Sequence, residues 1–157
     1  MADGSRIEKS VVIEAPRWRV WRAIADAREF GSWFGAKVVG DFVEGQTIRG
    51  PITHPGYEHL TMEFTVERIE PERLFSFRWH PYAIDPSVDY STEPTTLIEF
   101  HLEDTGAGTL LKIVESGFEQ IPASRRAEAL KMNEDGWEAQ ATNIQRHVLQ
   151  SQIAHPT

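Results

Sequence analysis

Hydrophobic and polar residues alternate near the start of the chain, and this alternation predicts a strand over residues 7–14. One side carries Ile7, Lys9, Val11 and Ile13, and the other carries Glu8, Ser10, Val12 and Glu14. Successive side chains of a strand point to opposite faces, so the two sets would face opposite sides of a sheet.

Two short helices are predicted next. Pro16 favours a helix start, because its missing N–H costs nothing at the first helical position. The buried edge of this helix would consist of Val20, Trp21 and Ile24. Asp26 separates it from a second helix, which carries Phe30, Trp33 and Phe34. Gly35 favours an end to that helix in the left-handed conformation.

From residue 36 onwards the period changes to two, which predicts a run of antiparallel strands. Two strands are predicted over residues 36–43 and 46–53, and a loop follows over residues 54–58. Alternating apolar residues predict four further strands, marked by Leu60, Met62, Phe64 and Val66, by Phe75, Phe77 and Trp79, by Ile98, Phe100 and Leu102, and by Leu111 and Ile113. A long loop at residues 81–94 and a hairpin turn at residues 105–108 connect them.

A long helix is predicted from Pro122 onwards. Residues spaced three and four apart form one stripe, which consists of Ala127, Leu130, Glu134, Trp137, Ala141, Ile144 and Val148. A helix of this length, on the order of 45 Å, needs a large surface to pack against. The order of elements predicts a single α+β domain over residues 5–153, whose curved sheet wraps around the last helix.

Composition narrows the class of protein. Twenty-four acidic and sixteen basic residues give a formal charge of −8. Such a chain repels phosphate backbones and anionic lipids, so we expect neither nucleic acid nor membrane as a partner. No apolar run reaches the roughly 18 residues that span a bilayer, and the first residues lack a signal-peptide pattern, which favours the cytoplasm. There is no cysteine, and no metal or cofactor motif surrounds the six histidines, so we expect no cofactor and no metal.

Five motifs follow one another in an order that resembles a known family. They are VIEAPRWRVWRAIAD near the start, FGSWFG in the second helix, FSFRW at the end of a strand, ESGF after the last strand and DGW in the long helix. Over residues 5–150 the chain is similar to the SRPBCC (START-like) superfamily, and within it to bacterial relatives of the activator of the heat-shock protein 90 ATPase. The resemblance implies a helix-grip (START/birch-pollen-allergen-like) fold, with a curved antiparallel sheet, a long C-terminal helix and two short helices after the first strand.

The resemblance also implies a cavity between the sheet and the long helix. Cavities of this superfamily hold lipids, hormones, polyketides and other apolar molecules. Periodicity alone favours core filling for the aromatic residues, whereas the resemblance implies that they line the cavity. The expected ligand-binding residues are Trp33, Phe34, Phe64, Phe77, Trp79, Tyr82, Phe100, Glu134, Trp137 and Ala141. Tyr82 belongs to the loop at residues 81–94, which would be either a surface loop or a rim of the pocket.

Glu134 is the only charged residue of the apolar stripe. A buried carboxylate without partners costs several kcal/mol, so it must be paired, protonated or close to water. Three interpretations follow: an ion pair with an arginine of the sheet or the first helices, a polar anchor in the cavity wall, or a general acid or base. Gly136, beside Trp137, would let the helix backbone approach a neighbouring element closely.

We expect a protein that binds a small, largely apolar molecule without catalysing a reaction. One alternative is an enzyme of the same fold that acts on a cyclic or aromatic substrate, with Glu134 as base and Tyr82 or His80 assisting. Another is a module that contacts a chaperone or forms a homodimer. The eukaryotic activators carry a separate N-terminal domain for which these 157 residues leave no room. We therefore do not extend their chaperone activation to this chain.

Overall fold

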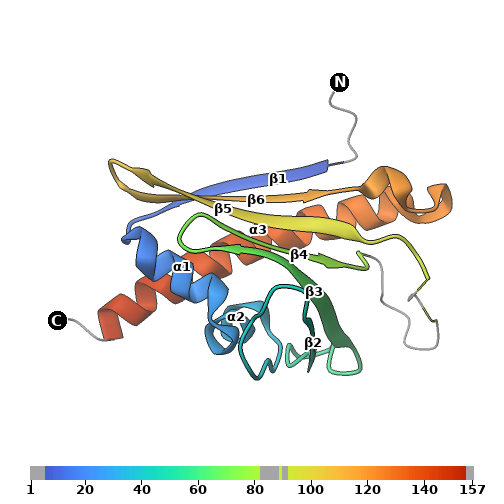
Figure 1. Cartoon of the computed structure of the whole chain (residues 1–157), viewed down its shortest axis with the longest axis horizontal. Helices are drawn as coiled ribbons and strands as arrows, with labels where there is room; N and C mark the ends of the chain where they lie inside the picture. The colour runs from blue at the N-terminus through green and yellow to red at the C-terminus, as the bar shows by residue number, and fades with distance from the viewer. Residues whose placement is uncertain (1–5, 82–88, 90–91, 155–157) are drawn as a thin grey trace.

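The computed structural model describes residues 6–81, 89 and 92–154, with side chains up to residue 150. Its elements in chain order are β1 (Arg6–Ile13), α1 (Arg17–Ala25), α2 (Ala27–Phe34), β2 (Thr47–Pro51), β3 (Thr61–Glu70), β4 (Leu74–Trp79), β5 (Thr96–Thr105), β6 (Gly108–Ser116), a short 3₁₀ turn η1 (Phe118–Gln120) and α3 (Ala123–Ala154). Figure 1 shows α3 running along the sheet, with α1 and α2 beside its C-terminal half.

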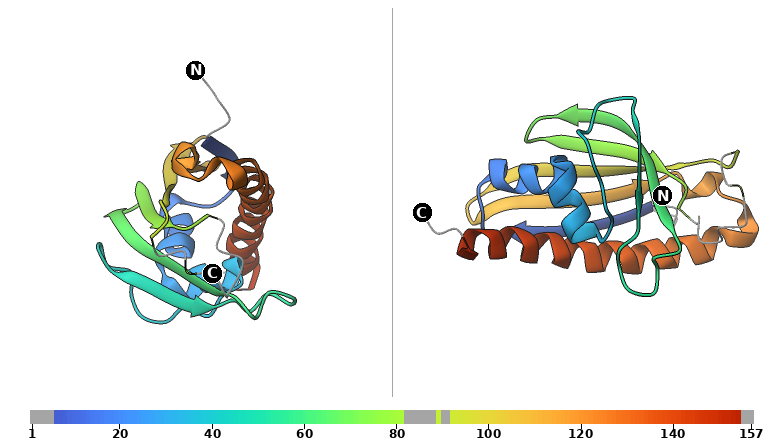
Figure 2. Two further views of the ribbon diagram at one scale, coloured as in Figure 1. Left: turned by 90° about the vertical axis from the view of Figure 1, so that its right-hand side faces the viewer. Right: turned by 90° about the horizontal axis from the view of Figure 1, so that it is seen from below.

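The strands form one antiparallel sheet in the order β1-β6-β5-β4-β3-β2. Because β1 pairs with the last strand, β1 and β2 are the two edges of the sheet. The sheet curls, and α3 lies across its concave side, where it packs against β1, α1 and α2 (Figure 2). The predicted helix-grip architecture is confirmed.

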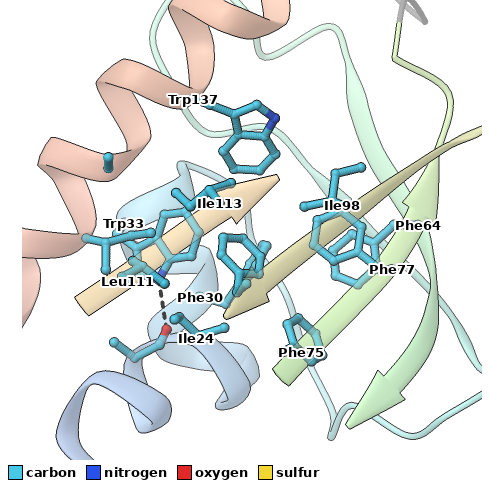
Figure 3. Packing of buried hydrophobic residues seen from close by; sticks show 14 of the residues in the cluster. Ile24, Phe30, Trp33, Phe64, Phe75, Phe77, Ile98, Leu111, Ile113 and Trp137 are labelled. Carbon is cyan, nitrogen blue, oxygen red and sulfur yellow. Dashed lines mark hydrogen bonds between the residues drawn. The ribbon is translucent and has the colours of Figure 1, made fainter. Parts of the chain in front are cut away.

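The alternating patterns place the apolar side chains on the concave face of the sheet, as predicted. In β3, Met62, Phe64 and Val66 are buried, and in β5 the same holds for Ile98, Phe100 and Leu102. The buried residues of sheet and helices form one continuous cluster. Phe30 of α2 lies at its centre, between the sheet and the helices (Figure 3).

The two short helices begin and end where the sequence predicts. Pro16 precedes the first turn of α1, and the Asp26 side chain caps α2 by accepting a hydrogen bond from the Glu29 backbone N–H at 3.0 Å. Gly35 ends α2 with φ 91° and ψ 41°, the left-handed conformation that glycine adopts without steric cost.

The predicted strand over residues 36–43 is wrong. This segment forms only an isolated bridge between Ala36 and Ile52, and one further backbone bond from the Lys37 N–H to the Pro51 carbonyl. Gly40 then adopts φ 92°, which turns the chain away from the extended conformation before a ladder can continue. The next strand, predicted over residues 46–53, is present in shorter form as β2.

The predicted stripe of α3 is correct in its C-terminal half. In its N-terminal half it is correct at Leu130, which is half-buried against the core, and wrong at two other positions. Trp137, Ala141, Ile144 and Val148 are buried. Ala127 and Glu134, however, are exposed, and Ala129 is buried instead. Going back along α3 from Trp137, the residues that face inward are Asn133 and Ala129, each four positions before the last. The prediction alternated steps of three and four, and it therefore chose the wrong residues in this part of the helix. No helix in the described part of the chain is long and apolar enough to cross a membrane.

Candidate functional site

Most of the predicted ligand-binding aromatic residues converge on one cluster under α3. Their ring centroids lie at contact distance: 4.1 Å between Phe64 and Phe77, 5.4 Å between Phe77 and Trp79, and 5.6 Å between Trp79 and Trp137. Phe100 contacts Trp137 at 5.7 Å. Such distances are typical of stacked and edge-to-face pairs that pack directly against each other. These rings therefore contact one another as a core does.

Trp33 and Phe34 connect this cluster to the short helices. The Trp33 indole Nε1 donates a hydrogen bond to the Ala23 carbonyl at 2.8 Å, which ties α2 to α1 (Figure 3). Phe34 stacks on Phe30 at 5.4 Å and meets Trp79 edge-on at 6.0 Å. Phe30, which was expected only as part of the helix, contacts more aromatic rings than either of them, including Phe64 at 5.5 Å.

A buried carboxylate, which the sequence reasoning missed, lies beside this cluster. Glu115 of β6 is fully buried and accepts hydrogen bonds from four side chains of β4, β5 and α3. Its donors are Trp79 Nε1 at 2.9 Å, Thr96 Oγ1 at 2.5 Å, Trp137 Nε1 at 2.7 Å and Asn133 Nδ2 at 3.1 and 3.2 Å. We call these four residues the donor cluster. They join α3 to the middle of the sheet through one side chain.

Burial raises the pKa of the Glu115 carboxyl above its ordinary value, because water no longer solvates the charged form. The hydrogen bonds of the donor cluster act in the opposite direction and reduce the effect. None of the four donors carries a positive charge, and among the described residues no cation forms an ion pair with this carboxylate. The arrangement links α3 to the sheet and makes the strength of that link sensitive to the charge on Glu115.

The sequence contained a signal for Glu115. Leu111 and Ile113 were assigned to the buried face of β6, and the next position with the same orientation is residue 115. The conflict between an inward position and a carboxylate was noticed instead at Glu134. The sequence reasoning therefore identified the right kind of residue on the wrong element.

The expectation that Glu134 lies on the buried stripe is wrong. Its side chain is 59% exposed and pairs with Lys9 of β1, whose Nζ lies 3.6 Å from Oε2. The polar position that α3 turns inward is Asn133, one residue earlier. Glu134 thus stands outside the aromatic cluster, in a surface ion pair with a lysine and not with the expected arginine.

Gly136 differs from its expected role. A methyl group built on its Cα would meet nothing within 4 Å, so the helix does not approach a neighbouring element there. α3 continues through this position without a break. Of the residues named for catalysis, His80 Nε2 lies 3.1 Å from the Glu93 carbonyl, and Tyr82 lies outside the described residues.

A groove of about 720 Å³ opens on the other side of α3 from β1. Its walls come from the end of α2, from the loop between β2 and β3, and from the exposed face of α3. Apolar side chains line one part of it: Trp33, Phe34, Ile52 and Leu60. Gly136, Ala139, Gln140, Asn143, Arg146 and His147 of α3 line another part, and His54 and Tyr57 belong to the loop. Of the ten predicted ligand-binding residues, Trp33 and Phe34 border this groove.

Three polar residues of α3 form a chain of hydrogen bonds along the groove, which we call the polar ladder. Gln140 Nε2 donates to the Phe34 carbonyl at 3.2 Å, and its Oε1 accepts from Asn143 Nδ2 at 3.1 Å. Asn143 Oδ1 in turn accepts from Arg146 Nη1 at 3.4 Å. Because the first amide is oriented by a backbone carbonyl, every later donor and acceptor is oriented too. The ladder ends at the Arg146 guanidinium.

A network of charged side chains lies near the C-terminal end of α3, where His147 also lines the groove. Glu29 of α2 binds Arg19 at 2.9 Å, Arg22 at 2.8 Å and His147 at 2.8 Å. Burial raises the pKa of Glu29, but the hydrogen bonds from Arg22, His147 and Arg19 outweigh it and leave that pKa below its ordinary value. Glu29 therefore stays ionised and holds α1, α2 and α3 together.

Among the residues that the structure describes, no group of three or more His, Asp or Glu side chains is placed to hold a metal ion. The candidate site consists of two parts. The first is the buried Glu115 with its donor cluster, and the second is the groove with its polar ladder. Trp33, Phe34 and Trp79 connect the two through ring contacts.

Comparison with known proteins agrees with this architecture. The family model described as Activator of Hsp90 ATPase homolog 1-like protein matches residues 14–148. No curated protein sequence matches the chain significantly. Protein MLL2253 from Mesorhizobium loti is 19% identical with a TM-score of 0.72, and the match covers 92% of this chain and 97% of that one.

Two further solved structures are similar at the level of the fold. The Aha1 dimer from Colwellia psychrerythraea is 16% identical with a TM-score of 0.68, covering 91% of this chain and 95% of that one. DynU16, a putative protein in the dynemicin biosynthetic locus, is 21% identical with a TM-score of 0.69. That match covers 92% of this chain but 47% of DynU16. At these identities the likeness shows the fold alone.

Proposed function

The chain belongs to the Activator of Hsp90 ATPase homolog 1-like family, and we propose that it binds a small, largely apolar molecule in the groove between α2, α3 and the β2–β3 loop. The observation that carries the proposal is the groove itself. Its volume of about 720 Å³ falls within the roughly 300–1,000 Å³ that is typical of small-molecule sites. Its lining combines aromatic and aliphatic side chains with a few polar groups, which is the composition of such sites.

Two features support the groove over the interior as the location of the ligand. The aromatic side chains under α3 contact one another at 4.1–5.7 Å between ring centroids. The groove, in contrast, has an exposed backbone at Gly136 and a small exposed side chain at Ala139. Small residues on this face of α3 leave the volume that larger side chains would fill.

The fold neighbours are compatible with this function without specifying it. DynU16 is a putative protein in a biosynthetic locus, which suits a fold that handles small molecules. The Aha1 structure from Colwellia psychrerythraea is a dimer, so the test of function should also measure the number of subunits. The enzyme alternative with Glu134 as base receives less support, because that carboxylate is exposed and pairs with Lys9.

The proposal is tested with Nile red, an uncharged apolar dye whose fluorescence rises in apolar surroundings. We expect saturable binding at about one dye per chain. Ala139→Phe places a ring in the groove and should weaken dye binding at least about fivefold, since overpacking a site costs about 1–3 kcal/mol. Ala127→Phe is the matched control, because Ala127 is also exposed on α3 but does not line the groove.

Native mass spectrometry of the protein accompanies the titration, because it reports bound molecules and subunit number together. If Nile red does not saturate, or if Ala139→Phe and Ala127→Phe bind it equally well, the groove is not the binding site. Either result overturns the proposal.

A further inference from the structure

The charges around the groove differ from those of the whole chain. The chain carries eight more acidic than basic residues, yet the fifteen described residues that line the groove include one arginine and two histidines and no aspartate or glutamate. A ligand in the groove therefore meets the Arg146 guanidinium at close range, although the protein as a whole repels anions.

The basic groups near the far end of the groove are unequal in their partners. Arg19 and Arg22 are held by Glu29, and Asp26 adds its negative charge beside Arg22. His147 also bonds to Glu29, at 2.8 Å. These groups compensate one another within the network.

Arg146 differs from them. It is exposed, and within the described part of the chain it forms no ion pair. Its one hydrogen bond joins Nη1 to Asn143 Oδ1 at 3.4 Å. A guanidinium carries five N–H donors in a planar fork that fits a carboxylate, so most of its donors are available to a ligand.

Glu58 is an acidic residue of the β2–β3 loop, which forms one wall of the groove, and no ion pair joins it to Arg146 among the described residues. Glu58 does not line the groove, and its carboxylate accepts a hydrogen bond from the Gly56 backbone N–H at 2.8 Å. Backbone hydrogen bonds lower the pKa of Glu58, with a smaller contribution from the nearby His54 and His59. Glu58 is thus engaged within its own loop.

The polar ladder also limits where Arg146 points. Gln140 is bound to the Phe34 carbonyl, and Asn143 is oriented by Gln140, so the acceptor that holds Nη1 stays on the groove side of α3. Positioning of this kind lowers the entropic cost of binding an anion. The apolar wall formed by Trp33, Phe34 and Ile52 borders the same groove.

We propose that the ligand is an amphipathic anion with a carboxylate and an apolar, preferably aromatic, body. The carboxylate binds the free donors of Arg146, and the body lies against Trp33, Phe34, Ile52 and Leu60. This inference rests on the proposed function, because it assigns the ligand class of the same groove. It adds a residue that selects between anionic and neutral molecules of equal shape.

The test compares two probes of the same shape, 2-naphthylacetate and 2-naphthylacetamide, as competitors of bound Nile red. We expect the carboxylate to bind wild type about tenfold more tightly than the amide, because a hydrogen bond to a charged group is stronger than a neutral one. In Arg146→Gln the two affinities should become equal, while the affinity for the amide stays within about twofold of wild type. Raising the salt concentration should reduce the preference in wild type.

Arg28→Gln is the matched control. Arg28 is an exposed arginine of α2 that does not line the groove, and its substitution changes the net charge by the same amount. The control should keep the preference for the carboxylate. If the preference is absent in wild type, survives Arg146→Gln or disappears equally in Arg28→Gln, the anion inference is overturned. Nile red binding that is blocked by Ala139→Phe would still support the proposed function in that case, whereas loss of Nile red binding itself would overturn both.

Discussion

Removing the Glu115 carboxylate tests the link between α3 and the sheet. Glu115→Ala deletes the acceptor shared by Trp79, Thr96, Asn133 and Trp137. Each buried donor left unsatisfied costs about 1–3 kcal/mol, and Thr96 and Trp137 are the two that are almost inaccessible to water. Glu115→Ala also removes a buried charge, which is stabilising and offsets part of the cost of the unsatisfied donors. We therefore expect the free energy of unfolding to fall by about 2–5 kcal/mol.

Glu115→Gln isolates the charge, because it preserves the shape and one acceptor oxygen. Burial raises the folded-state pKa of Glu115 above the ordinary value of 4.5. A raised pKa means that the folded state binds the proton more tightly than the unfolded state. Its contribution to stability is complete below pH 4.5 and is lost as the pH rises through the folded-state pKa. The glutamine variant has no such loss.

The two proteins should therefore differ in a pH-dependent way. Near pH 4.5 wild type and Glu115→Gln should unfold within about 1 kcal/mol of each other, because a neutral carboxyl group and an amide are similar in shape and polarity. As the pH rises to 8, the variant should become the more stable of the two. Urea denaturation, followed by tryptophan fluorescence at several pH values, measures this difference directly.

Glu134→Gln is the control for a change of charge without a change of buried contacts. Its carboxylate is 59% exposed, so the substitution should alter stability by less than about 0.5 kcal/mol at any of these pH values. A Glu115→Gln variant that loses stability relative to wild type as the pH rises would refute the reasoning. That result would mean that the donor cluster favours the ionised form more than burial disfavours it.

Three other substitutions, two of them paired with a comparison substitution, test further features of the structure. Trp137→Ala should lower the free energy of unfolding by about 3–5 kcal/mol in denaturant unfolding, because Trp137 is buried against Trp79 and Phe100. Trp18 is half-exposed, so Trp18→Ala should cost far less. Equal losses in the two variants would contradict the packing. Gly136→Ala should raise the melting temperature through about 1 kcal/mol of helix propensity, since the added Cβ would meet nothing within 4 Å. Gly31→Ala should lower the melting temperature, since the added Cβ would lie 2.4 Å from the Ala36 carbonyl oxygen. Glu29→Gln should cost about 1–3 kcal/mol at pH 7 by leaving Arg19 without its partner. Because the pKa of Glu29 is lowered, the contribution of Glu29 to stability is present above pH 4.5 and is lost as the pH falls through the folded-state pKa. Melting temperatures of Glu29→Gln should therefore depend less on pH in that acidic range than those of wild type.

The sequence was sufficient for most of the fold because its signals are local. Alternation in Met62, Phe64 and Val66 follows from the pleat of a strand, whose side chains must alternate whatever the rest of the chain does. The ends of α2 follow from Asp26 and Gly35 in the same way. The family resemblance supplied the architecture, a curved antiparallel sheet around a long C-terminal helix, and the structure agrees with it; the sheet order with β1 beside β6 came from the structure.

The candidate site was predicted in part. The aromatic residues do come together, since apolar residues on the inner faces of sheet and helices have a single core in which to pack. Whether their rings leave a cavity or touch one another depends on distances of an ångström or two, and these are decided by the curvature of the sheet and the depth of α3. Residues such as Phe30 and Phe42 fill space that the sequence pattern alone left unassigned.

The choice between Glu115 and Glu134 shows where the sequence stopped being informative. Each element's inward face is set by its own periodicity, and for β6 that periodicity points Glu115 inward beside Leu111 and Ile113. The rotation of a 32-residue helix about its axis is less determined, because 3.6 residues per turn let the inward face drift between positions 133 and 134. Only packing against β4, β5 and β6 turned Asn133 towards Glu115 and left Glu134 beside Lys9.

By itself, then, the sequence determined most of the elements, the inward faces of the strands and, with the family resemblance, the class of fold, because strand alternation, capping and helical periodicity act within a few residues of each other. The tertiary structure alone decided three things: the donors around Glu115, the contacts of the aromatic rings, and the groove that Arg146 borders. Each of these joins residues from β4, β5, β6, α2, α3 or the β2–β3 loop that are far apart in the chain. Their distances follow from the curvature of the sheet and the position of α3 on it, which no short stretch of sequence specifies.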